Sequence, residues 1–284
     1  ESWELSCHKD GPSVVADGEY KGLTLNEYIE KAGKGVLGKN CERFENFPIL
    51  IKLIDAKDNL SVQVHPDNDY AMRVEGEYGK TEMWYVVDCD EGATLLYGFK
   101  HEITKEEFAR RIADNTLLEV TNAVPVKKGD VFFIKSGTLH AIGKGILIAE
   151  IQQNSNTTYR IYDYGRVGKD GKPRELHVNK ALDVTKLAPA EQYPETPVEK
   201  KDGYDIKLLS KCEYFTTYRV NVETKAELDA DENSFNSILV LEGEPVISGG
   251  ETVSAKKGES VFISAGTGKY TVEGKCTFVL TKID

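Results

Sequence analysis

The stretch that decides the fold runs from Lys127 to His140 and reads KKGDVFFIKSGTLH. It returns near the carboxyl end as KKGESVFISAGTGK, from Lys256 to Lys269, without a gap. In each copy a Lys-Lys-Gly turn and an acidic residue lead into a short apolar run, which stops at a Gly-Thr turn. Because such a repeat marks a duplicated structural unit, the sequence predicts two halves that share one strand-turn-strand plan.

A second, looser match concerns a strand that precedes the first copy. Glu82–Asp88 corresponds to Asn236–Glu242, and the carboxylate of Glu82 is replaced by an amide. In the first match, His140 is replaced by Lys269, a side chain that repels a cation. These two losses predict that any metal chemistry belongs to the amino-terminal half and that the carboxyl-terminal half has no such site.

Short β-branched and aromatic runs dominate the chain, and they predict a mainly β fold of the sandwich or barrel type. The clearest runs are 47–54, 83–87, 131–134 and 145–149. Two helices are expected where a Thr is followed three residues later by a Glu, the pattern of a capping box, at Thr24 and Thr104. In the second helix Phe108 and Ile112 share one face, so we expect that helix to pack as a cover over the strands.

The segment 187–204 is rich in Pro, Glu and Lys and lacks apolar periodicity. Such a composition is typical of a domain boundary. We therefore predict a site-bearing domain with helical insertions over residues 1–188 and a second domain without a metal over residues 189–284.

Composition excludes several classes of function. The formal charge of −11 over 284 residues disfavours nucleic acid, because Lys and Arg are scattered among more numerous acids. No apolar run is long enough to span a bilayer, so a membrane protein is not expected. Five widely spaced cysteines without a CxxC pair, and no recognisable leader, favour reduced thiols and a cytoplasmic location.

Four side chains could hold one metal ion. Gln63 and His65 stand two residues apart, so on a strand they point to the same face. Glu82 begins an apolar strand, and His140 follows the Gly-Thr turn of the repeated motif. Nitrogen and oxygen ligands brought together from separate strands suit a zinc-like ion.

These motifs resemble a known family. The segment 129–140 looks like the second cupin motif, and the series Gln-x-His-Pro-Asp, Lys-x-Glu and Gly-Thr-x-His is similar to that of type I mannose-6-phosphate isomerases, in their short bacterial form. The likeness covers most of the chain, from 1–3 to 156–160. It implies two cupin-type jelly-roll barrels and one zinc ion per chain, held by Gln63, His65, Glu82 and His140.

The resemblance also implies a reaction, the interconversion of an aldose and a ketose phosphate through an enediol or enediolate. By resemblance Arg160 is the arginine of the catalytic site, and Lys80 and Glu150 face the same cavity. Lys80 and Arg160 would bind substrate oxygens or phosphate, and Ser61 is a further candidate for phosphate. Glu150, Lys80 and a metal-bound water all remain candidates for the group that carries the proton between C1 and C2.

Two positions depart from the longer members of the family, which tend to have His before the Lys and Asp four residues before the Arg. This chain has Gly79 and Asn156 there, so proton-transfer roles do not carry over. His8, His101 and His177 lack paired ligand spacing, although His8 and His177 could line the mouth of the site.

Two other functions fit parts of the pattern. An iron-dependent cupin dioxygenase would use a similar barrel, but the neutral amide of Gln63 is a poor ligand for that chemistry. A non-catalytic sugar-binding module would explain a barrel without a site, but not Lys80, Glu150 and Arg160 beside four ligands. The expected partner is a small sugar phosphate, with no nucleic acid or membrane, and the chain is expected to be a monomer or a weak homo-oligomer.

Overall fold

The computed structural model describes residues 1–168 and 171–284. Two compact units are present. The first contains Ile54–Tyr193 together with Glu1, and the second contains Ser2–Leu53 and Pro194–Asp284. The second unit therefore includes an amino-terminal segment that the sequence assigns to the first domain. The division into domains at residues 188 and 189 stays a prediction.

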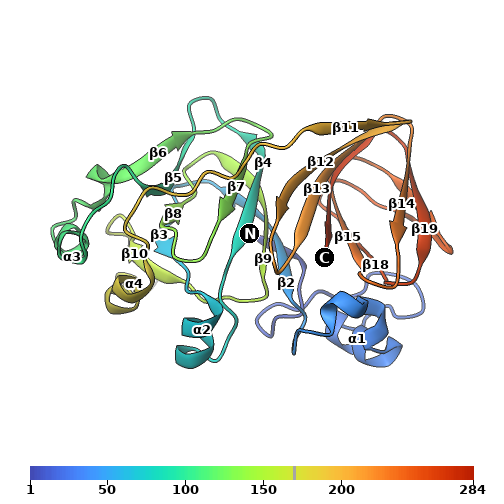
Figure 1. Cartoon of the computed structure of the whole chain (residues 1–284), viewed down its shortest axis with the longest axis horizontal. Helices are drawn as coiled ribbons and strands as arrows, with labels where there is room; N and C mark the ends of the chain where they lie inside the picture. Colours follow the sequence, from blue (N-terminus) through green and yellow to red (C-terminus); the bar gives the residue numbers. More distant parts are fainter. Residues whose placement is uncertain (169–170) are drawn as a thin grey trace. The chain divides into compact units, whose positions relative to one another are not determined.

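The first unit is a pair of antiparallel sheets covered by helices (Figure 1). In one sheet β4 pairs with β9 on one side and with β7 on the other. The other sheet has the strand order β10-β3-β8-β5-β6. The strands and helices of the first unit are β3 (Val62–Val64), α2 (Asn68–Val74), β4 (Glu82–Cys89), β5 (Thr94–Phe99), α3 (Lys105–Ala113), η3 (Leu117–Glu119), β6 (Thr121–Pro125), β7 (Val131–Ile134), β8 (His140–Ala141), β9 (Ile146–Gln153), β10 (Tyr159–Tyr162) and α4 (Val178–Val184).

The second unit is also built from two antiparallel sheets, with strand orders β11-β12-β13-β20-β15-β18 and β14-β19-β16-β17. Strand β2 (Ile49–Ala56) pairs with β1 and contains the division between the units, which falls after Leu53. The remaining elements are β1 (Ser2–Leu5), α1 (Leu25–Ala32), η1 (Lys34–Leu37), η2 (Lys39–Cys41), β11 (Val198–Lys201), β12 (Tyr204–Lys211), β13 (Thr216–Val222), β14 (Lys225–Ala230), β15 (Asn236–Gly243), β16 (Val246–Gly249), β17 (Glu251–Ser254), β18 (Ser260–Ile263), β19 (Gly268–Glu273) and β20 (Cys276–Lys282).

The mainly β fold is confirmed, and the two halves repeat each other down to the register of their strands. Glu82 of β4 lies opposite Ile134 of β7, and Asn236 of β15 lies opposite Ile263 of β18. The two sequence matches align Glu82 with Asn236 and Ile134 with Ile263, so the two pairs occupy equivalent positions. Each central strand buries alternate apolar side chains, Trp84 and Val86 in β4, and the equivalent positions in β15. The site-bearing strand of the first half therefore has a direct counterpart in the second.

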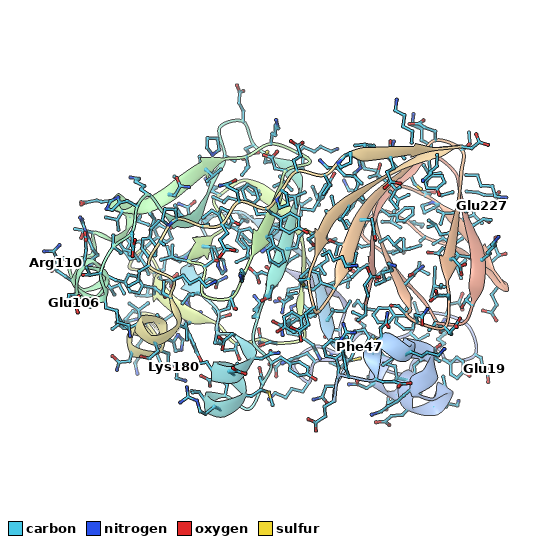
Figure 2. All side chains as sticks on the ribbon, in the orientation of Figure 1. Glu19, Phe47, Glu106, Arg110, Lys180 and Glu227 are labelled. Atoms are coloured by element: carbon cyan, nitrogen blue, oxygen red, sulfur yellow. The ribbon has the colours of Figure 1, made fainter. Side chains whose placement is uncertain are left out.

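Both predicted helices are present, and their caps explain where they begin. Thr24 and Glu27 form the full capping box of α1. In α3 the Thr104 side chain accepts from the Glu107 backbone as predicted, but the Glu107 carboxylate accepts a hydrogen bond from Arg111 instead of reaching back. Figure 2 shows Arg110 on the outer side of α3, as the burial of the opposite face requires.

The amino-terminal segment belongs to the second unit because specific contacts hold it there. Tyr28 of α1 forms a hydroxyl hydrogen bond of 2.7 Å with Ser264, and the Phe47 ring packs against Phe235. The backbone amides of Lys39 and Asn40 donate to the loop before β15. Across the described residues, no helix combines the length and the apolar character needed to cross a bilayer.

Candidate metal centre

Three predicted ligands converge inside the first unit. His65, Glu82 and His140 are at most 1% exposed, and one ligand atom from each lies within 4.8 Å of the others. His140 Nε2 is 3.4 Å from one Glu82 oxygen, and His65 Nε2 is 3.7 Å from the other. The Gln63 amide nitrogen lies 3.3 Å from His140 Nε2, which places the fourth predicted ligand at the same point.

The two imidazoles are held in the orientation that a metal requires. His65 Nδ1 donates to the Thr157 carbonyl at 2.9 Å, and His140 Nδ1 donates to the Thr138 carbonyl at 2.8 Å. Because a carbonyl only accepts, each ring must carry its proton on Nδ1 and present a lone pair at Nε2. The two Nε2 atoms lie 3.1 Å apart. A cation between them and the Glu82 carboxylate would stabilise this arrangement, so the residues fit a divalent ion.

Burial and charge set the ionisation of the site. Burial lowers the pKa of His140 to about 4, so the ring is neutral and able to bind a metal near neutral pH. For Lys80, burial lowers the pKa, but the Glu150 and Glu82 carboxylates outweigh it and hold the pKa above its ordinary value. Lys80 is therefore a buried ammonium group, with Nζ 2.9 Å from Glu82 and 3.6 Å from Glu150.

A tryptophan that the sequence analysis did not single out as a site residue completes this polar group. Trp84 donates from Nε1 to Glu150 at 2.8 Å and sets its ring edge-on to His140 at 5.2 Å between centroids. The sequence could have indicated this role, because Trp84 stands two residues after Glu82 on one strand and that spacing puts both side chains on the same face. Trp84 fixes the Glu150 carboxylate beside the candidate metal ligands.

Lys80 and Glu82 are placed by a network of amide groups. The Thr81 backbone amide donates to Gln153 Oε1 at 2.9 Å, and the Gln153 side chain donates to Asn68. The Gly79 amide also donates to Asn68, at 2.8 Å. A Cβ on Gly79 would lie 2.5 Å from the backbone of Asp67, so no side chain fits there. The close approach of this backbone accounts for Gly79 in this chain.

Arg160 lies on the same sheet as two of the ligands. On three neighbouring strands Arg160 is opposite Gln63, which is opposite His140, so the three side chains share one face of the sheet. The Arg160 side chain is partly buried, and burial lowers its pKa. One guanidinium nitrogen donates to the Glu175 carbonyl at 3.0 Å, and the Arg160 backbone amide donates to His177 Nδ1.

The loop that returns to Arg160 is braced by a second group the sequence analysis missed. The Asp163 carboxylate accepts two hydrogen bonds from the Arg174 guanidinium, at 2.7 and 2.5 Å. Arg166 donates to the same carboxylate and, at 2.6 Å, to the Asn59 carbonyl. Asp163 therefore holds both Arg166 and Arg174. Arg174 directly precedes Glu175, whose carbonyl accepts the hydrogen bond from Arg160.

The remaining residues named in the sequence analysis, Ser61 and three histidines, lie at different distances from the candidate metal centre. Ser61 is buried just before β3, two residues from Gln63. His177 lies against the Arg160 backbone, whereas His101 is exposed on the surface. His8 belongs to the second unit, where its ring packs edge-on against Trp3.

In the second barrel the reason for the lost ligand differs from the one the sequence suggests. Lys269, which aligns with His140, is exposed and points out of the barrel. The inward position is taken by Tyr270, whose hydroxyl accepts a hydrogen bond of 2.9 Å from Asn236, the counterpart of Glu82. Among the described residues, only His65, Glu82 and His140 form a group of three metal-binding side chains of the His, Cys, Asp and Glu types.

Comparison with known proteins agrees with this architecture. Residues 1–92 match the family model for the phosphomannose isomerase type I catalytic domain, and residues 205–283 match that for the mannose-6-phosphate isomerase cupin domain. The crystal structure of mannose 6-phosphate isomerase from Bacillus subtilis superposes with a TM-score of 0.92 at 38% identity, over 98% of this chain and 88% of that one.

Curated relatives extend the match to the whole chain. Mannose-6-phosphate isomerase of Streptococcus mutans is 39% identical over 93% of this chain and 82% of its own. Mannose-6-phosphate isomerase ManA of Bacillus subtilis is 39% identical over 100% of this chain and 89% of its own. On this evidence the chain belongs to the type I mannose-6-phosphate isomerase family, the family that its motifs resemble.

Proposed function

We propose that this chain is an aldose-ketose isomerase that interconverts mannose 6-phosphate and fructose 6-phosphate with one bound zinc ion. The observation that carries the proposal is the convergence of His65, Glu82 and His140, with both imidazoles turned so that Nε2 faces the carboxylate. Gln63 completes the ligand set. When bound, such an ion supplies a Lewis acid for the oxygens on which charge develops during enolisation.

Lys80 and Glu150 would have complementary parts in the reaction. Because the pKa of Lys80 is raised, its ammonium group keeps its protons near neutral pH and would donate hydrogen bonds to the developing negative charge. A protonated ammonium cannot take up the proton that leaves the sugar carbon. The Glu150 carboxylate, fixed by Trp84, is therefore the better candidate for the base that carries this proton.

Arg160 would bind the anionic part of the substrate. Its guanidinium is a planar donor on the same sheet face as Gln63 and His140. We place Ser61 at the same end of the substrate because it directly precedes β3, the strand on which Gln63 lies opposite Arg160. The substrate would lie across β10, β3 and β8.

The test is a coupled assay for fructose 6-phosphate formation from mannose 6-phosphate, with metal analysis of the same protein. Chelation should lower kcat by at least about 100-fold, and added zinc should restore it. Glu82→Gln should abolish both zinc retention and activity, whereas Glu106→Gln at the exposed start of α3 should change neither. Full activity after complete removal of metal would refute the metal-dependent mechanism, and bound iron with oxygen uptake would favour a dioxygenase.

A further inference from the structure

The second barrel contains a cavity at the position that corresponds to the metal centre of the first. The cavity has a volume of about 470 Å³, which lies within the ordinary range for small-molecule sites. Asn236 lines it, and by strand register Asn236 is the counterpart of Glu82. The duplicated fold has thus kept a cavity where the first half keeps its chemistry, although the metal ligands are gone.

The floor of this cavity is apolar and partly aromatic. Leu208, Tyr218 and Leu280 lie opposite one another on three adjacent strands, so their side chains form a continuous row. Tyr204 lies four residues before Leu208 on β12, and Leu228 lies on β14 of the other sheet. Both line the cavity and are only partly buried although they pack against the core. Aromatic rings left half-open in a concave site offer flat faces for an apolar surface of a ligand.

The rim is polar but electrically balanced. Lys201 forms an ion pair of 3.1 Å with Glu199, and Lys282 forms one of 2.7 Å with Asp284. Because each ammonium group already has a carboxylate partner, the rim offers little net attraction for a phosphate dianion. The same rim groups donate and accept hydrogen bonds, so they suit a ligand that carries several hydroxyl groups. The Asn236 amide nitrogen is already engaged, because it donates to the Asp229 carbonyl and to the Tyr270 hydroxyl.

We infer that this cavity is a second binding site, for a neutral monosaccharide ring, separate from the isomerase site. A pyranose has an apolar face of C–H groups that can lie on Tyr218 and Tyr204, and an edge of hydroxyl groups that can meet the rim. The ligand differs from the proposed substrate in being uncharged and unphosphorylated. The inference does not depend on the proposed isomerase activity, because none of its residues belongs to the first unit.

The experiment uses methyl α-mannopyranoside, a pyranose whose ring cannot open and which no isomerase can convert. Saturation-transfer NMR at millimolar sugar should give a signal with the full-length protein. Tyr218→Ala, which removes the floor, and Leu228→Trp, which fills the cavity, should each weaken binding by about tenfold. Both variants should keep the isomerase activity of the unmodified protein.

His140→Ala in the first barrel is the matched control and should leave the sugar signal unchanged. Two results would overturn the inference. One is the absence of a signal with the unmodified protein, and the other is a signal that vanishes in His140→Ala but persists in the two cavity variants. Because Tyr218→Ala enlarges the cavity and Leu228→Trp fills it, poor folding of one variant does not decide the outcome.

Discussion

At the scale of single residues, the site depends on charges that are buried together. Lys80, Glu82 and Glu150 are each at most 4% exposed, and the lysine lies between the two carboxylates. Such a group is stable only while every charge has its partner, because an unpaired buried charge costs several kcal/mol. The loop carboxylate of Asp163 follows the same rule with Arg166 and Arg174, but at the edge of the site.

Asp163 is expected to act on catalysis through Arg160. Asp163→Asn removes the charge that holds both arginines, so the loop loosens and the Glu175 carbonyl no longer fixes the Arg160 guanidinium. We expect kcat to fall by about 10- to 100-fold with zinc content unchanged. Steady-state kinetics and metal analysis measure this. Asp183→Asn, a change of an exposed carboxylate that pairs with Lys105, is the control and should have little effect.

The same substitution should show a particular dependence on pH. Burial raises the pKa of Asp163, but Arg174 and Arg166 outweigh it and hold the pKa below its ordinary value. The unfolded chain therefore binds more protons than the folded chain in acid, and the stabilisation is present above about pH 4 and lost as pH falls further. The deficit of Asp163→Asn in free energy of unfolding, about 1–3 kcal/mol at neutral pH, should shrink in acid. Urea unfolding measured at several pH values through this acid range tests the expectation. A deficit in unfolding free energy that did not change with pH would contradict the ion pairing of Asp163 with Arg166 and Arg174.

At the scale of elements, the turn before β8 decides where His140 lies. Gly137 has a φ of +84°, its amide donates to the His65 carbonyl, and a Cβ there would lie 2.8 Å from the Val184 carbonyl oxygen. Its counterpart Gly266 has a φ of +81° but open space around the missing Cβ. The repeat therefore contains two glycine turns with nearly the same φ and different surroundings.

This difference gives a matched pair of substitutions. Gly266→Ala should cost about 1–2 kcal/mol of unfolding free energy, from the positive φ alone. Gly137→Ala should cost about 2–4 kcal/mol, because the backbone must also shift, and that shift should weaken zinc binding by moving His140. Denaturant unfolding and zinc titration of both variants measure these effects. Equal losses in the two variants would show that the Val184 contact has no influence.

The sequence predicts much of how the strands are arranged, but not all of it. The repeat predicted that the two halves share one strand plan, and the equivalent pairings of β4 with β7 and of β15 with β18 agree with it. It could not show that Tyr270 replaces Lys269 on the inner face, since an ungapped match hides a shift of one residue. Nor could it place the amino-terminal segment, because the contact of Tyr28 with Ser264 joins residues 236 positions apart.

At the scale of the whole molecule, the metal should stabilise one unit and leave the other unaffected. The predicted ligands lie within Ile54–Tyr193, and the second unit has its own core. Hydrogen exchange measured with and without zinc should show added protection in β3, β4 and β8, with no change in β15, β19 and β20. Protection that rises equally in both units would mean that they unfold together, contrary to this expectation.

The inward tyrosine of the second barrel has a consequence for protein engineering. The sequence match suggests that a metal ligand should be introduced at Lys269, but that side chain is exposed and would place the ligand on the surface. The productive exchanges are at Tyr270 and Asn236, whose side chains already touch inside the barrel. An ion site in this barrel would therefore require redesign of its interior, beginning with these two side chains.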